Sequence, residues 1–345
     1  TGTLNRRGAK SNPVVDTHLE VACANSGRDG SSAHAIAEAL SVAADQITWR
    51  MSSHDRTGEP DLVAFSGNYT GTSIIGPAAL LPSDVISTLL GAPKEDHGSL
   101  RIWTETLMHR EDGDASLPPA AGEAAKSLLA SFAALIQKKR KHPGDDLTSG
   151  LVQAELDGDR LSDNDILGFC FLLISGGNET TEKLIANTVH QLARHPEQRA
   201  RIVADPGLIP AAIEESLRFR SQTQYMERTT TRDVELHGET IPKGSKVALL
   251  IGAGNHDPRK FDHPDRFDIG RVIGRHLAFG FGPHFCLGAR LARLEARVAL
   301  EEIHRRMPDY EVDEAGISVV HAGNIAGLKT LPIRFTPSRP LNPAG

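Results

Sequence analysis

Residues 279–288 read Phe279-Gly280-Phe281-Gly282-Pro283-His284-Phe285-Cys286-Leu287-Gly288. Two glycine-bearing turns lead to one cysteine, and a basic amphipathic segment begins immediately after it, at residue 289. The pattern predicts an apolar loop that delivers a thiol to the first turn of a helix, where the partial positive charge and the free N–H groups favour a thiolate. The glycines allow the backbone to approach a large flat group without Cβ clashes. We expect Phe279, Phe281 and Phe285 to keep water away from the sulfur.

The spaced pattern Phe-x-x-Gly-x-His-x-Cys-x-Gly resembles the haem-ligand loop of the cytochrome P450 family. The resemblance implies that the cofactor is haem b and that Cys286 is the thiolate ligand of its iron. It also implies that His284, His276 and Arg228 point toward the haem propionates. The further residues that it places against the haem are Phe279, Gly280, Gly288, Gly176 and Gly177.

Two other interpretations of the cysteine loop stay open from the residues alone. A lone cysteine in a glycine-rich turn is more often a buried structural residue. A zinc site built from His276, His284 and Cys286 would lack a fourth ligand at a usual spacing, so we consider it the weakest interpretation.

The second informative stretch is a helix predicted from residue 162 to residue 195, about 45 Å long. Ser162 is its predicted N-cap. In its middle Gly176 and Gly177 cost about 2 kcal/mol relative to alanine, which indicates that the helix opens there or needs space. The adjacent Glu179 and Thr180 resemble the acid–alcohol pair of the P450 family, which delivers protons beside bound O2. The alternative is that the glycines serve helix–helix packing and the threonine bonds back to a carbonyl.

Glu215 and Arg218 lie three residues apart on one predicted helix face and can pair. In the family the matching pair is buried and bonded to a later arginine, and the resemblance makes Arg266 that third, structural member. The resemblance also selects the residues that contact the substrate. These are Leu172, Ser175, Gly176, Thr223, Gln224, Asn324 and Ile325.

The composition is that of an ordinary globular protein, with 345 residues, 39% hydrophobic residues and a net charge of −6. The negative charge gives no reason to expect nucleic-acid binding. Three scattered cysteines suit a reducing compartment. The longest apolar run, residues 166–174, is far shorter than the roughly 20 residues of a membrane span. We therefore expect a cytoplasmic protein that binds neither nucleic acid nor membrane.

The predicted fold is mainly α with small β-sheets, in a single P450-like, haem-enclosing domain over residues 33–345 that follows an irregular segment over residues 1–32. The predicted helices span residues 32–51, 82–90, 100–109, 119–141, 162–195, 196–203 and 210–219. The predicted strands span residues 225–236, 246–251, 317–321 and 328–335.

The function implied by the resemblance is haem-thiolate monooxygenation of a small organic substrate by O2. The electrons must come from outside, because the sequence has no flavin or nicotinamide motif, and a ferredoxin is the expected donor. Arg290, Arg293 and Arg297 share one helix face that is a candidate footprint for an acidic partner, although an ordinary solvated face explains them equally well. The alternatives are a haem-binding protein without turnover and a peroxygenase that uses H2O2 directly.

Overall fold

The computed structural model describes residues 75–335, apart from residues 112, 115, 157 and 158. The predicted boundary at residue 32 and the predicted helix over residues 32–51 lie outside the described residues. The extent of a single domain over residues 33–345 therefore stays a prediction.

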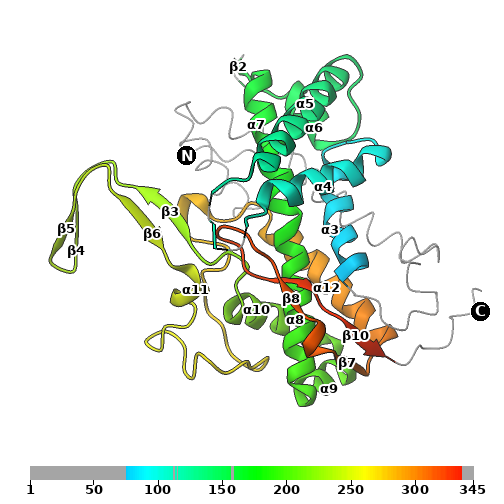
Figure 1. Ribbon diagram of the computed structural model, residues 1–345, viewed down its shortest axis with the longest axis vertical. Helices are drawn as coiled ribbons and strands as arrows, with labels where there is room; N and C mark the ends of the chain where they lie inside the picture. The colour runs from blue at the N-terminus through cyan, green and yellow to red at the C-terminus, as the bar shows by residue number, and fades with distance from the viewer. Residues whose placement is uncertain (1–74, 112, 115, 157–158, 336–345) are drawn as a thin grey trace, which may run out of the picture.

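Helices form the body of the molecule, as predicted (Figure 1). The described α-helices are α3 (Ile75–Leu89), α4 (His97–Met108), α5 (Pro119–Lys141), α6 (Leu147–Gln153), α7 (Asp163–Gly177), α8 (Glu179–Arg194), α9 (Pro196–Ala204), α10 (Ile209–Phe219), α11 (Ile251–Gly254) and α12 (Ala289–Arg306). The described 3-10 turns are η2 (Lys94–Asp96), η3 (Pro206–Leu208), η4 (Gly282–His284) and η5 (Glu314–Gly316). The predicted helices over residues 100–109, 119–141, 196–203 and 210–219 are confirmed as α4, α5, α9 and α10.

The helix predicted to begin at Pro82 begins earlier. α3 starts at Ile75 and carries Pro82 inside it. An internal proline lacks the N–H that a helix needs and usually marks a helix start, which is why the sequence suggested a later beginning. Tertiary packing outweighs this cost, because Ile86 and Leu90 are buried in a hydrophobic cluster with α4, α5, α6 and α7.

The helix predicted over residues 162–195 is interrupted at Asn178, whose φ and ψ angles are −77° and −72°. The prediction of one continuous rod is therefore wrong, whereas the predicted opening beside Gly176 and Gly177 is confirmed. Figure 1 shows α7 and α8 stacked end to end. The predicted N-cap is also confirmed, because the Ser162 hydroxyl accepts from the backbone N–H of Asp165 and the Asp165 carboxylate accepts from the N–H of Ser162.

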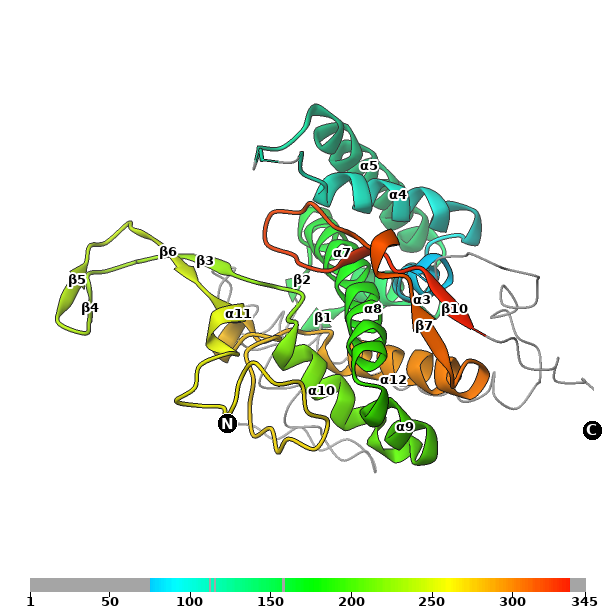
Figure 2. The ribbon, with the colours of Figure 1, turned by 60° about the horizontal axis from the view of Figure 1, so that its bottom comes forward.

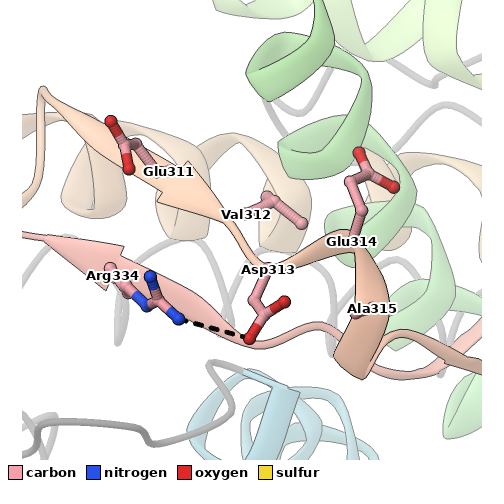
Figure 3. A pocket seen from close by; sticks show the side chains of 6 residues that line it. All are labelled: Glu311, Val312, Asp313, Glu314, Ala315 and Arg334. Carbon is pink, nitrogen blue, oxygen red and sulfur yellow. Dashed lines mark ion pairs between the residues drawn. The ribbon is translucent and has the colours of Figure 1, made fainter.

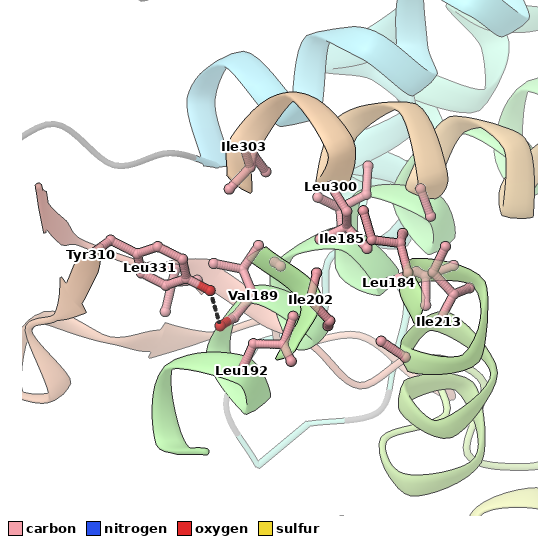
Figure 4. Packing of buried hydrophobic residues seen from close by; sticks show 14 of the residues in the cluster. Leu184, Ile185, Val189, Leu192, Ile202, Ile213, Leu300, Ile303, Tyr310 and Leu331 are labelled. Atoms are coloured by element: carbon pink, nitrogen blue, oxygen red, sulfur yellow. Dashed lines mark hydrogen bonds between the residues drawn. The ribbon is translucent and has the colours of Figure 1, made fainter. Parts of the chain in front are cut away.

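Two hydrophobic clusters stabilise the described part of the chain, and the break between α7 and α8 separates them. One cluster receives Ile166, Cys170 and Ile174, which recur every four residues along α7 and so lie on one face. The other cluster gathers side chains of α8, α9, α10 and α12 (Figure 4). In it Tyr310 is 1% exposed and donates its hydroxyl to the carbonyl of Val189 at 2.9 Å. The break thus lies where two separately packed cores meet.

The described strands form small antiparallel pairs, as predicted. The pairs are β1 (Glu155–Leu156) with β2 (Asp159–Arg160), β3 (Met226–Thr229) with β6 (Lys246–Leu249), β4 (Val234–Leu236) with β5 (Glu239–Ile241), β7 (Tyr310–Val312) with β10 (Ile333–Phe335), and β8 (Ser318–Val319) with β9 (Leu328–Thr330). The single strand predicted over residues 328–335 is therefore two strands, which separate at Leu331 and Pro332.

The strands β3 to β6 form an arm that projects from the helices (Figure 2). The one strand predicted over residues 225–236 is split into β3 and β4, and the predicted turn at His237 and Gly238 is confirmed by their positive φ angles of 52° and 85°. The strand predicted to be buried over residues 246–251 is mostly exposed in β6, and Ile251 already starts α11. Its apolar residues suggested a core strand, but the projection of the arm leaves them in solvent.

Within the described residues, no helix combines the length and the apolarity that crossing a lipid bilayer requires.

Candidate active site

Cys286 lies in a loop whose shape is set by its own backbone. The N–H of Cys286 donates to the carbonyl of Phe279 at 2.8 Å, and the N–H of Gly280 donates to the carbonyl of Leu277 at 2.7 Å. Gly280 and Gly282 have φ angles of +73° and +71°, a region in which a side chain would be strained. The two glycines therefore permit the tight turns that present Cys286 ahead of α12, as predicted for this loop.

The Cys286 side chain is exposed to solvent, which excludes the interpretation as a buried structural cysteine. Surrounding protein atoms nevertheless desolvate the sulfur and raise the pKa of its thiol. The backbone N–H of Gly288 and the charge of Arg293 act in the opposite direction and favour the thiolate. The zinc interpretation gains no support, because among the described residues no group of three or more His, Cys, Asp and Glu side chains could hold a metal ion.

The three phenylalanines of the loop do not act alike. Phe279 packs against the cluster of α8, α10 and α12, and its ring centre lies 6.3 Å from that of Phe285. Phe281 is 64% exposed and carries the guanidinium of Arg275 at 4.7 Å from its ring centre. The expectation that all three exclude water from the sulfur is therefore wrong for Phe281, which the adjacent turn at Gly282 directs outward.

Gly176 and Gly177 have different surroundings. A Cβ atom on Gly176 would meet no atom within 4 Å, whereas one on Gly177 would lie 3.1 Å from Cγ1 of Ile86 on α3. The packing alternative thus explains Gly177, and the open-space prediction applies to Gly176. The Thr180 hydroxyl donates to the carbonyl of Gly176 at 2.7 Å across the break. This is the bond back to a carbonyl that the structural alternative predicted, and it places the hydroxyl at the break beside Gly176.

Glu179 is 6% exposed, and its Oε2 atom has no hydrogen-bond partner. Burial raises its pKa to about 7, against the lowering influence of Lys183, while Glu182 and Glu105 raise it further. Lys183 itself pairs with Glu182 at 3.2 Å. Glu179 is therefore a carboxyl group that can both hold and release a proton near neutral pH.

The structure brings four of the predicted substrate residues together. Thr223 and Ile325 form an isolated antiparallel bridge, and the N–H of Gln224 donates to the carbonyl of Asn324 at 2.8 Å. The Gln224 amide also lies against Gly252, where a Cβ atom would come within 2.5 Å of its Oε1 atom. This side chain is therefore held by the protein itself.

The other substrate residues lie on α7. Leu172 is 64% exposed one turn before Gly176, and the Ser175 hydroxyl is buried without a hydrogen-bond partner. The tip of the β8–β9 hairpin approaches this region, because Ala322 bridges to His109 after α4 and Gly327 packs on Lys183 of α8. A ligand bound here would therefore meet an apolar side chain, Leu172, on α7 and the polar tip of the β8–β9 hairpin.

The three residues predicted to hold propionates lie in different settings. His284 is exposed at the end of η4. Arg228 is half-buried on β3 and donates to the carbonyl of Glu227 at 2.8 Å. His276 is 8% exposed and both its ring nitrogens are occupied, one by Glu214 at 3.1 Å and the other by the N–H of Ala278 at 3.2 Å. His276 thus has no donor left for a propionate, which argues against that prediction.

Glu215 and Arg218 form the buried pair that the sequence predicted, with two contacts of 2.8 Å. The third charged member is Arg271, whose Nε atom lies 3.2 Å from Glu215, and not Arg266. Arg266 contributes only its backbone carbonyl, which accepts from Arg218 at 3.3 Å. The prediction of Arg266 is corrected because the chain turns after it and returns Arg271 toward α10.

The residues present fit a haem group. Gly176, Gly282 and Gly288 each leave free space of 4 Å around the position of a Cβ atom, so the backbone can be approached closely. Cys286 is an accessible sulfur donor, and thiolate is one of the ligands that proteins supply to haem iron. Large apolar side chains near the same segments are exposed, among them Leu172 and Leu250 at 64% and 61%. Apolar side chains of this kind are what a largely apolar ligand contacts.

A hollow of about 280 Å³ elsewhere does not belong to this site (Figure 3). It is lined by strands β7 and β10 and by η5, where Arg334 and Asp313 lie 3.5 Å apart. The lining is largely charged and includes none of the predicted site residues.

Sequence reasoning missed two residues that hold the cysteine loop, Glu214 and Asn255, and a third, Arg271, that supports the neighbouring segment. Asn255 accepts the N–H of Leu277 at 2.6 Å through its side chain. Glu214 contacts His276 and Arg293, as described below. For Glu214, the signal in the sequence was a pair of adjacent acids at 214 and 215. The resemblance assigned a role to Glu215 and none to Glu214.

Comparison with known proteins gives consistent similarities. The sequence model of the family described as Cytochrome P450 matches residues 207–307. The putative cytochrome P450 123 of Mycobacterium tuberculosis is 49% identical over 257 residues, which are 74% of this chain and 64% of that relative. The steroid C26-monooxygenase of Mycolicibacterium smegmatis is 40% identical over 273 residues, 76% of this chain and 67% of that relative.

Among solved structures, cytochrome P450 CYP109Q5 from Chondromyces apiculatus superimposes with a TM-score of 0.78 at 32% identity, over 97% of this chain and 83% of that one. The chain spans about 64% of the length of the mycobacterial P450 123 that it matches.

Proposed function

Because the chain belongs to the cytochrome P450 family, we propose that it binds haem b through Cys286 and inserts one atom of O2 into a small organic substrate. The observation that carries the proposal is the placement of an exposed cysteine directly before α12. That helix packs against α8, which begins at the break beside Gly176. The cluster that packs α8 against α12 thus connects the helix after the break to the helix after the cysteine loop.

Cys286 is the proposed iron ligand, and Gly280 and Gly288 are the positions at which the backbone comes closest to the haem. His284 and Arg228 are the proposed propionate contacts. We leave His276 out, because Glu214 already occupies its ring N–H. When bound, a haem with a thiolate ligand supplies O2 activation, since the thiolate donates electron density that favours O–O cleavage.

Glu179 and Thr180 are the proposed proton donors. Thr180 holds its hydroxyl at the Gly176 carbonyl, where it can orient a water molecule in the open space of the break. Glu179 keeps a proton near neutral pH because it is buried, and its unpartnered oxygen is free to release that proton. The pair therefore combines a proton source with a group that positions the receiving water.

The substrate is proposed to be largely apolar, with Leu172 providing apolar contact and the 223–224 and 324–325 segments forming a polar border. This agrees with two relatives of the chain, which are named steroid C26-monooxygenase and methyl-branched lipid omega-hydroxylase. The exposed apolar residues of this region support the same choice.

A ferredoxin is the proposed electron donor. The basic footprint on α12 is narrower than the sequence suggested, because Arg293 pairs with Glu214 at 2.5 Å and Arg297 pairs with Glu301 at 2.7 Å. The charges of both arginines are therefore partly neutralised by carboxylates of the same chain. We therefore expect the attraction of an acidic partner to depend on salt and to be modest.

The test is the spectrum of the reduced, haem-loaded chain under CO. A thiolate ligand gives a strongly red-shifted Soret band, which Cys286→His should abolish and Cys170→Ala should leave in place. Persistence of the band in Cys286→His, or its absence in the unmodified chain, would contradict the assignment of Cys286. Product formed per electron pair consumed, with surrogate ferredoxin partners, then separates a monooxygenase from a haem-binding protein without turnover.

A further inference from the structure

Glu214, on α10, touches both sides of the Cys286 loop. Its Oε2 atom lies 3.1 Å from Nε2 of His276, which precedes the loop. Its two carboxylate oxygens also lie 2.5 and 3.0 Å from Nε and Nη2 of Arg293, in the second turn of α12 after the loop. One carboxylate therefore connects the irregular segment before the loop, the helix after it and α10. We call Glu214, His276 and Arg293 the Glu214 cluster.

The His276 contact has a defined direction. Its Nδ1 atom accepts the backbone N–H of Ala278 at 3.2 Å, so in the neutral ring the proton is on Nε2 and is donated to Glu214. Phe279, the residue directly after Ala278, accepts the N–H of Cys286 at 2.8 Å. The position of His276 is therefore transmitted to Cys286 through three residues and one backbone hydrogen bond.

Arg293 fixes the other side of the loop. Its bidentate contact with Glu214 leaves Nη1 to donate to the carbonyl of Ala289, the first residue of α12, at 3.1 Å. Its guanidinium also lies over the ring of Phe279, 4.5 Å from the ring centre. Arg293 thus contacts both the start of α12 and the residue that binds the Cys286 N–H, and a bidentate charged pair is among the stronger side-chain contacts.

The neighbouring acid serves a different segment. Glu215 bonds to Arg218, Arg271 and the N–H of Asp268, and so holds residues 255–271. Of the two adjacent carboxylates, only Glu214 reaches the residues on either side of Cys286. This separation allows the two roles to be tested independently.

We propose that Glu214 is the positioning residue of the cysteine loop, holding it against α10 and α12 and balancing the charge of Arg293 beside the sulfur. The proposal rests on the proposed function only in taking the Cys286 sulfur as the ligand of haem iron. The holding of the loop is a property of the chain itself.

The first experiment is hydrogen exchange of the chain without haem, comparing the unmodified protein with Glu214→Gln. Glutamine keeps the size of the side chain but removes the charge and one bidentate contact. We expect amides of residues 276–287 to exchange about 10- to 100-fold faster, since a charge-assisted hydrogen bond is lost, and amides of residues 255–271 to be unchanged. Exchange at residues 276–287 equal to that of the unmodified chain would overturn the proposal.

The second experiment measures the reduction potential of the haem-loaded chain. In Glu214→Gln the positive charge of Arg293 is no longer balanced, so the potential should shift to more positive values. In the double variant Glu214→Gln, Arg293→Gln the potential should return toward the original value, while exchange in the loop stays fast. A purely structural role would not produce this return, and an unshifted potential in Glu214→Gln would overturn the charge-balancing part.

Glu301→Gln is the matched control, because it removes an acid from an exposed ion pair with Arg297 on the same helix. It should change neither the exchange of residues 276–287 nor the potential, and a change equal to that of Glu214→Gln would overturn the assignment. If Glu214→Gln does not fold, Arg293→Lys takes its place, since lysine keeps the charge but cannot form the bidentate contact. It should speed exchange in the loop, and unchanged exchange would overturn the proposal. Failure of the haem assignment would appear separately, in the CO spectrum of Cys286→His.

Discussion

The different surroundings of the glycines on α7 make a sharp prediction about Gly176. Gly176→Ala adds one methyl group where no atom lies within 4 Å of the Cβ position. Gly168 lies on the same helix, is exposed, and has equally free space at its Cβ position, so Gly168→Ala is a matched control. Gly177→Ala is the contrasting variant, because its methyl would lie 3.1 Å from Ile86.

For stability, alanine in place of glycine in a helix contributes about 0.5–1 kcal/mol. Gly168→Ala and Gly176→Ala should therefore each raise the free energy of unfolding by up to about 1 kcal/mol, with the smaller gain at Gly176 because it is the penultimate residue of α7. In Gly177→Ala the contact with the buried Ile86 side chain opposes this gain, and overpacking of a core costs about 1–3 kcal/mol. We expect that variant to be neutral or less stable in urea denaturation of the haem-free chain.

For function, the same methyl group at Gly176 should be harmful, because it fills the space that we assign to the haem and to oxygen. We expect product formation to fall on the order of 10- to 100-fold, because an overpacking cost of about 1–3 kcal/mol in the haem-loaded site corresponds to a rate change of that size, while Gly168→Ala turns over at the original rate. The assay is product formed and peroxide released per electron pair consumed. If Gly176→Ala is both more stable and as active as Gly168→Ala, the open space at the helix break is not part of the site.

Further predictions concern protons and charges. Thr180→Ala should still bind haem and consume electrons but release them as peroxide, and retention of the original coupling would show that the hydroxyl only bonds to the helix. Since burial raises the pKa of Glu179 to about 7, its protonated form declines above that pH; turnover should fall there, and Glu179→Gln should remove this limb of the pH profile. Arg271→Ala should destabilise the fold by about 3 kcal/mol by removing a partner of the buried Glu215, whereas Arg266→Ala should change stability by at most about 0.5 kcal/mol in urea denaturation. Burial tends to raise the pKa of Glu214, but hydrogen bonds from His276 and Arg293 outweigh burial and lower the pKa to about 2. The stabilisation that the Glu214 carboxylate provides is therefore full above the ordinary pKa of 4.5 and is lost as pH falls toward 2. Glu214→Gln should remove this pH dependence of acid unfolding.

Local features of the fold were predictable from the sequence because a few neighbouring residues determine them. The helix α5 spans the predicted residues 119–141, and Ser162 is the predicted N-cap of α7, which forms a capping box with Asp165 three residues later. The cysteine loop is equally local, since its two positive-φ glycines and its Cys286 to Phe279 hydrogen bond lie within ten residues. The haem thiolate hypothesis could therefore be stated from residues 279–288 alone.

Tertiary structure decided which distant residues meet. Arg271, and not Arg266, reaches Glu215 across 56 residues, and Glu214 meets Arg293 across 79 residues. Likewise residues 176 and 177 are two adjacent glycines that the sequence cannot tell apart, but of the two only Gly177 has Ile86 of α3 beside it. Such contacts depend on how whole helices pack and on where the chain turns, and no periodicity or spacing within one segment records them. The sequence by itself thus determined the local structure and the chemistry offered by Cys286, whereas the three-dimensional packing of α3, α8, α10 and α12 decided what supports that sulfur and where space remains beside it.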